Sequence, residues 1–311
     1  MVTPKPILWN EVQRKHAAFI TLGNFDGVHL GHARVLQRLI EEARSLNLDP
    51  VVVTFEPHPR HYFRPDDPCH LLTSPREKSE LLASYPVEVI TLVFDAELAA
   101  LSAENFIQHF LLYRLQGQRF MLGHDHQFGA KAAGNASLLR SRVPNGQEAV
   151  QEIAPYSMAG EVVSSSAIRT HLEAGELKSA NHLLGRPFAY DGTVIHGLGR
   201  ARTLDVPTAN IETGCKEKVR VAAGVYFGNA QLASGVTYPA LANIGFSPTF
   251  GSGDHKIEVH IPGFNGDLYG QRLRFKLDQR HREERRFSDI SALKTQILED
   301  LMAFERISGP P

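Results

Sequence analysis

Residues 17–43, AAFITLGNFDGVHLGHARVLQRLIEEA, join an apolar run, a glycine-rich turn and an amphipathic run. The run 17–22 predicts a buried strand, because it is short, apolar and followed by glycine. Apolar residues then recur at helical spacing, at Val35, Leu36, Leu39, Ile40 and Ala43. A strand, a glycine loop and a helix in this order direct backbone N–H groups and the positive end of the helix dipole toward a ligand over the loop, usually a phosphate.

Two histidines lie where this helix is expected to begin. His29 and His32 are three residues apart, so both imidazoles can face the same place. As hydrogen-bond donors they could stabilise charge that develops on a phosphoryl group during transfer. The alternative is that the glycines only form a tight turn and that both histidines are polar surface residues. This stretch alone supports the two interpretations about equally.

The composition sets the class of protein. The chain has 311 residues, enough for two domains, with 33 basic against 34 acidic residues. No overall charge therefore draws it to nucleic acid or to a membrane, and an anionic ligand must be held by local groups. Cys69 and Cys215 form no C-x-x-C pair, which argues against a disulfide framework and a thiolate metal site. No apolar run approaches the roughly 20 residues of a membrane span, and residues 1–16 lack the features of a signal peptide. We expect a cytoplasmic protein, and its oligomeric state stays open.

The first half of the chain alternates strands and helices. Strands are predicted at 51–55, 87–94 and 119–123, with helices at 75–84 and 104–115. This alternation predicts a parallel sheet covered on both faces, with ligands at the carboxyl ends of its strands. Candidate residues lie at two of those ends, namely Phe55, Pro57 and His58 at one and Asp125 just after another. Histidines are abundant in this half, but no H-E-x-x-H spacing favours a metal site.

The segment VVSSSAIR, residues 162–169, precedes another helical run. A single serine there would simply cap the helix. Ser164, Ser165 and Ser166 followed by Arg169 instead offer hydroxyls, helix N–H groups and a guanidinium, which together suit a multiply charged phosphate. The chain contains neither a P-loop nor the G-x-G-x-x-G fingerprint, so a nucleotide must be held in another way.

The second half changes character near Arg186, which divides the chain into predicted domains 1–185 and 186–311. Short β-type segments occur at 192–196, 206–211, 224–230, 238–244, 255–261 and 272–277, and an amphipathic run follows at 290–304. This pattern predicts a small antiparallel barrel with a C-terminal helix. In PTAN, residues 207–210, the oxygens of Thr208 and Asn210 suit Mg²⁺. From these four residues alone, a simple turn is favoured.

Several segments resemble one known family. GNFDGVHLGH resembles the H-x-G-H signature of the nucleotidyltransferase superfamily in the form carried by bacterial FAD synthetases, and SSSAIR resembles its second signature. TFEPHP and FMLGHDHQFG are similar to segments that hold the flavin there, although His126 stands where an aromatic residue is usual. PTANI, GVYFGNA, NIGFSPTF, IEVHIPGFNGDLYG and RFSD resemble, in this order, the riboflavin kinase module. Nearly the whole chain therefore looks like a bifunctional riboflavin kinase and FAD synthetase.

For the first domain, the resemblance implies a Rossmann-like α/β nucleotidyltransferase in which the phosphate of FMN attacks the α-phosphate of ATP, giving FAD and pyrophosphate. His29 and His32 would be catalytic, and Phe55, Pro57, His58 and Asp125 would bind the flavin. The residues implied in nucleotide and phosphate binding are Gly23, Asn24, Phe25, Asp26, Gly27, Ser164, Ser165, Ser166 and Arg169.

For the barrel, the resemblance implies phosphorylation of riboflavin to FMN, with Glu258 as base and with Mg²⁺ and ATP at Thr208 and Asn210. The chain departs from the family at Ala201 and Asp205, where glycines are expected, and we expect weakened affinity for ATP. The alternative is an FAD synthetase whose inactive barrel only binds flavin. Two further alternatives are a different nucleotidyltransferase fused to a binding barrel and a non-enzymatic flavin-binding regulator.

Overall fold

The computed structural model describes residues 5–66, 70–196, 206–246, 255–285 and 287–308. The chain forms two compact units, Met1–Ser165 and Ser166–Pro311. Each unit is described by itself below. Cys69, Ala201 and Asp205 lie outside the described residues. None of the helices in the described ranges is long and apolar enough to cross a membrane.

The first unit contains a five-stranded sheet in the order β3-β2-β1-β4-β5. Its strands are β1 (Ala18–Leu22), β2 (Asp49–Glu56), β3 (Glu88–Val93), β4 (Gly117–Gly123) and β5 (Val150–Ile153). All four neighbouring pairs are parallel, which confirms the predicted parallel sheet, although β5 was not predicted. The strand order reverses between β1 and β4, and sheets of this kind bind ligands beyond the carboxyl ends of the strands at such a point.

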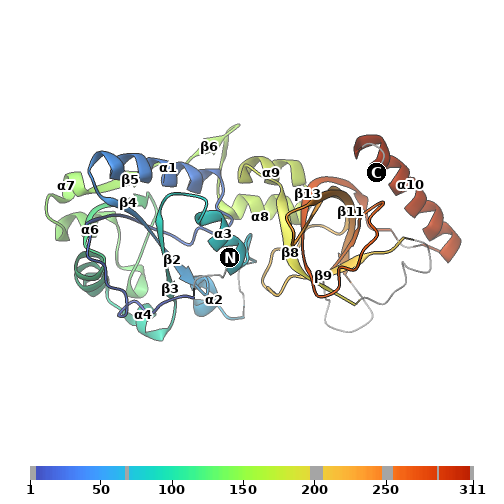
Figure 1. Ribbon diagram of the computed structural model, residues 1–311. Helices are drawn as coiled ribbons and strands as arrows, with labels where there is room; N and C mark the ends of the chain where they lie inside the picture. Colours follow the sequence, from blue (N-terminus) through green and yellow to red (C-terminus); the bar gives the residue numbers. More distant parts are fainter. Residues whose placement is uncertain (1–4, 67–69, 197–205, 247–254, 286, 309–311) are drawn as a thin grey trace. The chain divides into compact units, whose positions relative to one another are not determined.

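Period-two alternation along the strands builds a core on each face of this sheet. On one face, Phe19 packs against α1 (Leu30–Ser45) and α3 (Pro75–Leu82). On the other face, Ile20 packs with α4 (Ala96–Ala100), α5 (Ala103–Asn105), α6 (Ala136–Arg142) and the π-helix η1 (Phe106–Arg114). A helix is predicted from the sequence at 104–115, and most of it is π-helical in the structure. Figure 1 shows this unit as the blue to green part of the ribbon.

The remaining elements of the first unit are short. They are α2 (Pro59–Phe63), the 3-10 turn η2 (Ala130–Ala132), α7 (Gly146–Ala149) and the paired strands β6 (Ser157–Met158) and β7 (Glu161–Val162). Each of them lies outside the parallel sheet. The first two follow β2 and β4, where they extend the loops at the carboxyl ends of those strands.

The second unit contains a closed barrel in the order β10-β11-β12-β9-β8-β13. The strands are β8 (Phe188–Ile195), β9 (Ala209–Glu212), β10 (Gly224–Leu232), β11 (Thr237–Phe246), β12 (His255–His260) and β13 (Arg272–Glu283). Every neighbouring pair is antiparallel. The predicted antiparallel barrel is confirmed, and so is the C-terminal helix, α10 (Ile290–Ser308), drawn in red in Figure 1.

In the described part of the chain, three helices flank the barrel in the sequence. Phe304 of α10 packs edge-on against Phe227, and the buried Asp300 forms an ion pair with the half-buried Arg282. The helices α8 (Ser165–Ala174) and α9 (Leu177–Leu184) precede the barrel in the chain. The Asn181 amide donates to the Leu277 carbonyl at 2.9 Å and accepts from the Phe188 N–H at 2.7 Å. When all contacts within the chain are considered, the division between the two units falls after Ser165. The sequence instead predicts the domain boundary at residue 186.

Candidate active sites

The loop after β1 is held against β2 by two hydrogen bonds. The Gly23 N–H donates to the Val53 carbonyl at 3.0 Å, and the Thr54 hydroxyl donates to the Asn24 carbonyl at 3.1 Å. Gly27 has φ +84, and a Cβ there would lie 2.7 Å from Cδ1 of Leu72. Both the backbone conformation and the close approach therefore require glycine at this position.

His29 and His32 lie together at the start of α1. His29 is the N-cap, and its Nδ1 accepts the N–H of His32 at 3.3 Å. The two imidazole rings are stacked, with centroids 3.7 Å apart and planes 15° apart. Because Nδ1 of His29 is an acceptor, the neutral ring carries its proton on Nε2. The predicted proximity of these rings is observed, and their catalytic role stays a prediction.

Asp26 is buried, and its carboxylate accepts hydrogen bonds from the next part of the fold. The donors are the Leu72 N–H at 2.9 Å, the Thr73 N–H at 3.1 Å and the Thr73 hydroxyl at 3.3 Å. The Asp26 carbonyl accepts from the Ser165 hydroxyl at 2.9 Å, so one serine of the second motif reaches this loop. These contacts make Asp26 an anchor of the loop.

The other residues of the second motif are distributed around this point. Ser164 is half-buried and immediately precedes α8, whereas Ser166 and Arg169 lie within α8 and belong by their contacts to the second unit. The predicted phosphate clamp of these four residues stays a prediction.

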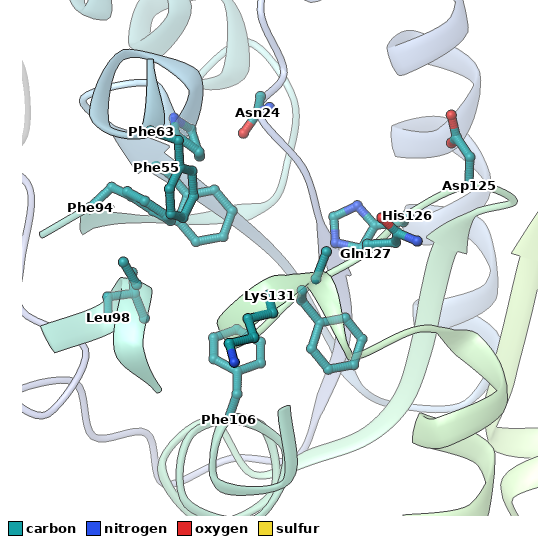
Figure 2. A pocket seen from close by; sticks show the side chains of 15 residues that line it. Asn24, Phe55, Phe63, Phe94, Leu98, Phe106, Asp125, His126, Gln127 and Lys131 are labelled. Atoms are coloured by element: carbon teal, nitrogen blue, oxygen red, sulfur yellow. The ribbon is translucent and has the colours of Figure 1, made fainter. Parts of the chain in front are cut away.

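A pocket of about 570 Å³ opens at the carboxyl ends of the sheet strands. Asn24 follows β1, Phe55 lies near the end of β2, Phe94 follows β3 and Asp125 follows β4, and all of them line the pocket. Its walls also carry Phe63, Phe106, Phe128, His126 and Lys131. Figure 2 shows Phe55, Phe63 and Phe94 grouped together, with Asp125 far from them. A pocket with aromatic walls and a few polar groups suits a flat ring system that carries a polar chain.

The predicted flavin residues meet this pocket in different ways. Phe55 and Asp125 line it, and so does Pro59. Pro57 follows a cis peptide bond with Glu56, and Nδ1 of His58 caps α2 by accepting the Arg60 N–H at 3.1 Å. His58 thus shapes the start of α2, whose first residue is Pro59.

Sequence reasoning missed most of the aromatic wall. Phe94 is the last residue of a predicted strand and directly follows β3, so the rule that ligands bind at strand ends could have identified it. Phe63 and Phe106 come from helices α2 and η1, and no sequence pattern associates them with the strand ends.

His126 is the unusual polar member of the wall. Burial lowers the pKa of His126 to about 4, and the nearby Asp125 carboxylate opposes this shift only in part. The imidazole is therefore neutral at pH 7 and can both donate and accept a hydrogen bond. The loop after it holds Lys131 and Ala132 at φ +57 and +55, in the left-handed region that is costly for side chains other than glycine.

The barrel brings a second group of polar residues together. Glu258 on β12 lies directly opposite Asn210 on β9 and Asn243 on β11. Ile257 and Val259, on either side of Glu258 in the chain, are buried in the barrel, so Glu258 belongs to the opposite face. Side chains directly opposite in neighbouring strands have Cβ atoms about 5 Å apart. The predicted base and one predicted metal ligand are thus close neighbours.

His260 holds the segment that carries Thr208. Its Nδ1 lies 2.8 Å from the Pro207 carbonyl, which accepts a hydrogen bond from the ring. Burial lowers the pKa of His260, and the bond to Pro207 opposes this shift in part. Within the described ranges, no group of three or more His, Cys, Asp or Glu residues is arranged to hold a metal ion. A metal at this site would depend on hydroxyl, amide and carboxylate oxygens.

Comparison with known proteins defines the class of both units. Residues 11–167 match the family model for FAD synthetase, and residues 184–308 match the model for riboflavin kinase. The chain is thus a fusion of two transferase domains.

The bifunctional riboflavin kinase/FMN adenylyltransferase of Pseudomonas fluorescens is 38% identical over 291 residues, covering 93% of each chain. The protein of the same name from Escherichia coli K12 is 36% identical, covering 93% of this chain and 92% of its own. A crystal structure titled macrolide-efflux protein from Streptococcus pneumoniae superposes with a TM-score of 0.85 at 27% identity, covering 99% of both chains. The chain belongs to the bifunctional riboflavin kinase/FMN adenylyltransferase family. The bifunctional transferase predicted from the sequence is confirmed, and the alternative with an inactive barrel is not favoured.

Proposed function

We propose that this chain makes FAD in two steps, phosphorylating riboflavin to FMN in the barrel and adenylylating FMN in the first unit. The main support for the adenylylation site comes from the loop after β1. The stacked His29–His32 pair follows this loop, and Asn24 of the same loop lines the aromatic pocket. A nucleotide loop and a flavin-sized pocket therefore meet at the edge of one sheet.

In the adenylyl transfer, the phosphate of FMN attacks the α-phosphate of ATP and pyrophosphate leaves. A phosphate anion needs no general base, so the protein contributes positioning and stabilisation of charge. His29 and His32 donate hydrogen bonds to the reacting phosphate, and the backbone of residues 23–27 and the start of α1 surround it. Ser164, Ser165, Ser166 and Arg169 bind the leaving pyrophosphate.

The pocket binds the isoalloxazine ring of FMN. Phe55 and the other phenylalanines cover its apolar faces, and Asp125 and His126 provide polar contacts. His58 supports this side by capping α2, which begins at Pro59, and Pro57 lies in the same segment.

In the kinase reaction, Glu258 accepts the proton of the ribityl hydroxyl as that oxygen attacks the γ-phosphate of ATP. Thr208 and Asn210 would hold Mg²⁺, which when bound neutralises charge on the transferring phosphoryl group. The donor set fits this ion, because Mg²⁺ prefers oxygen ligands and needs only one or two from the protein when substrate phosphates supply others. The cross-strand pairing of Asn210 with Glu258 supports this assignment.

ATP and flavins are thus the proposed partners, with no nucleic acid or membrane involved. Dependence of both reactions on ATP fits the cytoplasmic location expected from the sequence.

The test is incubation of the purified chain with riboflavin, ATP and MgCl₂, followed by chromatographic separation of riboflavin, FMN and FAD by fluorescence. We expect FMN and then FAD, and we expect loss of both products with EDTA. A second reaction starts from FMN and tests adenylylation alone. Formation of FAD from FMN without formation of FMN from riboflavin would support the alternative of an inactive barrel. Absence of both products at millimolar ATP would refute the proposed function.

A further inference from the structure

The segment 72–78, which contains the start of α3, lies between the two loops assigned to ATP and to FMN. Ser74 is the N-cap of α3 and Pro75 is its first residue. No motif of either loop includes this segment. Its side chains and backbone nevertheless bind both loops.

The first set of contacts fixes the loop after β1. The Thr73 hydroxyl accepts the Gly27 N–H at 3.0 Å and donates to the Asp26 carboxylate at 3.3 Å. The N–H groups of Leu72 and Thr73 also donate to this carboxylate, at 2.9 and 3.1 Å. Asp26, Gly27 and Thr73 are all buried. Water is therefore poorly placed to replace these charge-assisted bonds, and the loop that leads to His29 depends on the position of Thr73.

The second set of contacts fixes the segment after β2. The Lys78 ammonium donates to the Phe55 carbonyl at 3.0 Å and pairs with the Glu56 carboxylate at 2.6 Å. The two side chains are only 7% and 14% exposed. Phe55 and Pro59 line the pocket on either side of this anchored point in the chain. Lys78 thus fixes the backbone of the segment that carries Phe55 and Pro59.

The helix start that joins these contacts is itself rigid. Ser74 and Glu77 form a capping box, in which the Ser74 N–H donates to Glu77 at 2.6 Å and the Glu77 N–H donates to Ser74 at 3.2 Å. Such a reciprocal cap satisfies two backbone donors at once and fixes the first turn. Thr73 and Lys78 are therefore held at a constant separation by one stiff turn of helix.

We propose that Thr73 and Lys78 are positioning residues for FAD formation, Thr73 setting the ATP loop and Lys78 setting the flavin wall, with the start of α3 as their common support. Neither residue contacts the reacting atoms in this assignment. The inference rests on the proposed adenylylation of FMN in the first unit.

The experiment measures steady-state adenylylation of supplied FMN by pyrophosphate release in the full chain. The test variants are Thr73→Val and Lys78→Met, which keep side-chain size, and the rescue variants are Thr73→Ser and Lys78→Arg. The matched controls are Arg76→Met, which breaks only an exposed ion pair with Glu80 in the same helix, and Ser84→Ala, which removes an exposed hydroxyl just beyond its end. Thermal unfolding followed by circular dichroism reports whether the first unit of each variant is folded, and riboflavin phosphorylation in the same molecules reports that the barrel is intact.

We expect Thr73→Val to raise KM for ATP, and Lys78→Met to raise KM for FMN, each about tenfold or more, because small misplacements of binding groups are costly. Each variant should leave the other KM within about twofold, the rescue variants should recover most of the loss, and both controls should match the wild type. If Lys78→Met does not fold, Glu56→Gln takes its place with the same expected rise.

Equal changes in both KM values, or no change in either, would overturn the inference while wild-type FAD formation still supports the proposed function. Wild-type protein that makes no FAD from FMN would instead overturn the proposed function and the inference with it.

Discussion

At the residue scale, His29 has two separable tasks at the start of α1. It caps the helix through Nδ1, and it presents its imidazole beside His32. We predict that His29→Asn and His29→Ala both lower FAD formation by about 100-fold or more while riboflavin phosphorylation stays near normal. Only His29→Ala should also destabilise the first unit, by about 1 kcal/mol, since asparagine can still cap the helix.

The FAD assay and thermal unfolding measure these two effects. The double variant His29→Ala with His32→Ala should lose FAD formation completely with the kinase intact. Near-normal FAD formation by His29→Asn would reduce His29 to a helix cap, and equal loss of both activities in the double variant would contradict two separate sites.

His126 gives a prediction about pH. Its pKa in the folded protein is about 4, below the ordinary value of 6.5, so between these values the unfolded chain binds more protons than the folded one. Stability from this residue is therefore complete above about pH 6.5 and declines on acidification toward pH 4. At pH 5 the loss should reach up to roughly 2 kcal/mol. His126→Phe should remove this part of the pH dependence.

Thermal unfolding of wild type and His126→Phe at pH 7 and pH 5 tests this expectation. His260, whose pKa is also lowered, is present in both proteins and cancels in the comparison. Parallel pH profiles of the two proteins would contradict a neutral, half-buried His126.

At the scale of elements, the loop between β1 and α1 tolerates no side chain at Gly27. Gly27 and Gly235 have similar positive φ angles of +84 and +89, but only Gly27 would bring a Cβ against a neighbour, Leu72. We predict that Gly235→Ala costs about 1 kcal/mol from backbone strain alone, and that Gly27→Ala costs more because Leu72 must move as well. Gly27→Ala should also impair FAD formation, and Gly235→Ala should not.

Chemical unfolding and the adenylylation assay distinguish the two variants. The pair is matched because the backbone strain is common to both positions. Equal stability losses and unimpaired FAD formation in Gly27→Ala would show that the loop accommodates a side chain.

At the scale of the whole molecule, the contacts of α8 and α9 decide which fragment is stable. Asn181 joins α9 to β13 and to the start of β8, and the Ala222 N–H donates to the Leu172 carbonyl of α8 at 3.1 Å. We predict that residues 166–311 fold alone and phosphorylate riboflavin. The fragment 187–311 should also fold and bind flavin, but it should unfold at a lower temperature, because it loses these contacts.

Circular dichroism with thermal melting of both fragments measures the difference. Equal melting temperatures would show that α8 and α9 contribute nothing to the barrel. An unfolded fragment 187–311 would place the independent folding unit at residue 166.

Much of this protein is determined by patterns that neighbouring residues form in the sequence. The strand 17–22, the helix after it and the barrel segments follow from local sequence patterns, and the proximity of His29 and His32 follows from their spacing of three residues. The two domain types followed from motif order, which the family matches confirm. These patterns involve residues only a few positions apart, so they can be recognised without knowledge of the tertiary structure.

Other features were decided only by the tertiary structure. The pocket takes phenylalanines from separate strands and helices, Asp26 finds its partners at Leu72 and Thr73, and Glu258 meets Asn210 through strand register. The strand β5 and the π-helical turns of η1 were also not predicted from the sequence. These features depend on which distant segments pack together. The periodic pattern of a strand specifies which of its faces is buried, but it does not specify which other strand lies beside it. Tertiary packing therefore selects one arrangement among many that the local pattern allows equally.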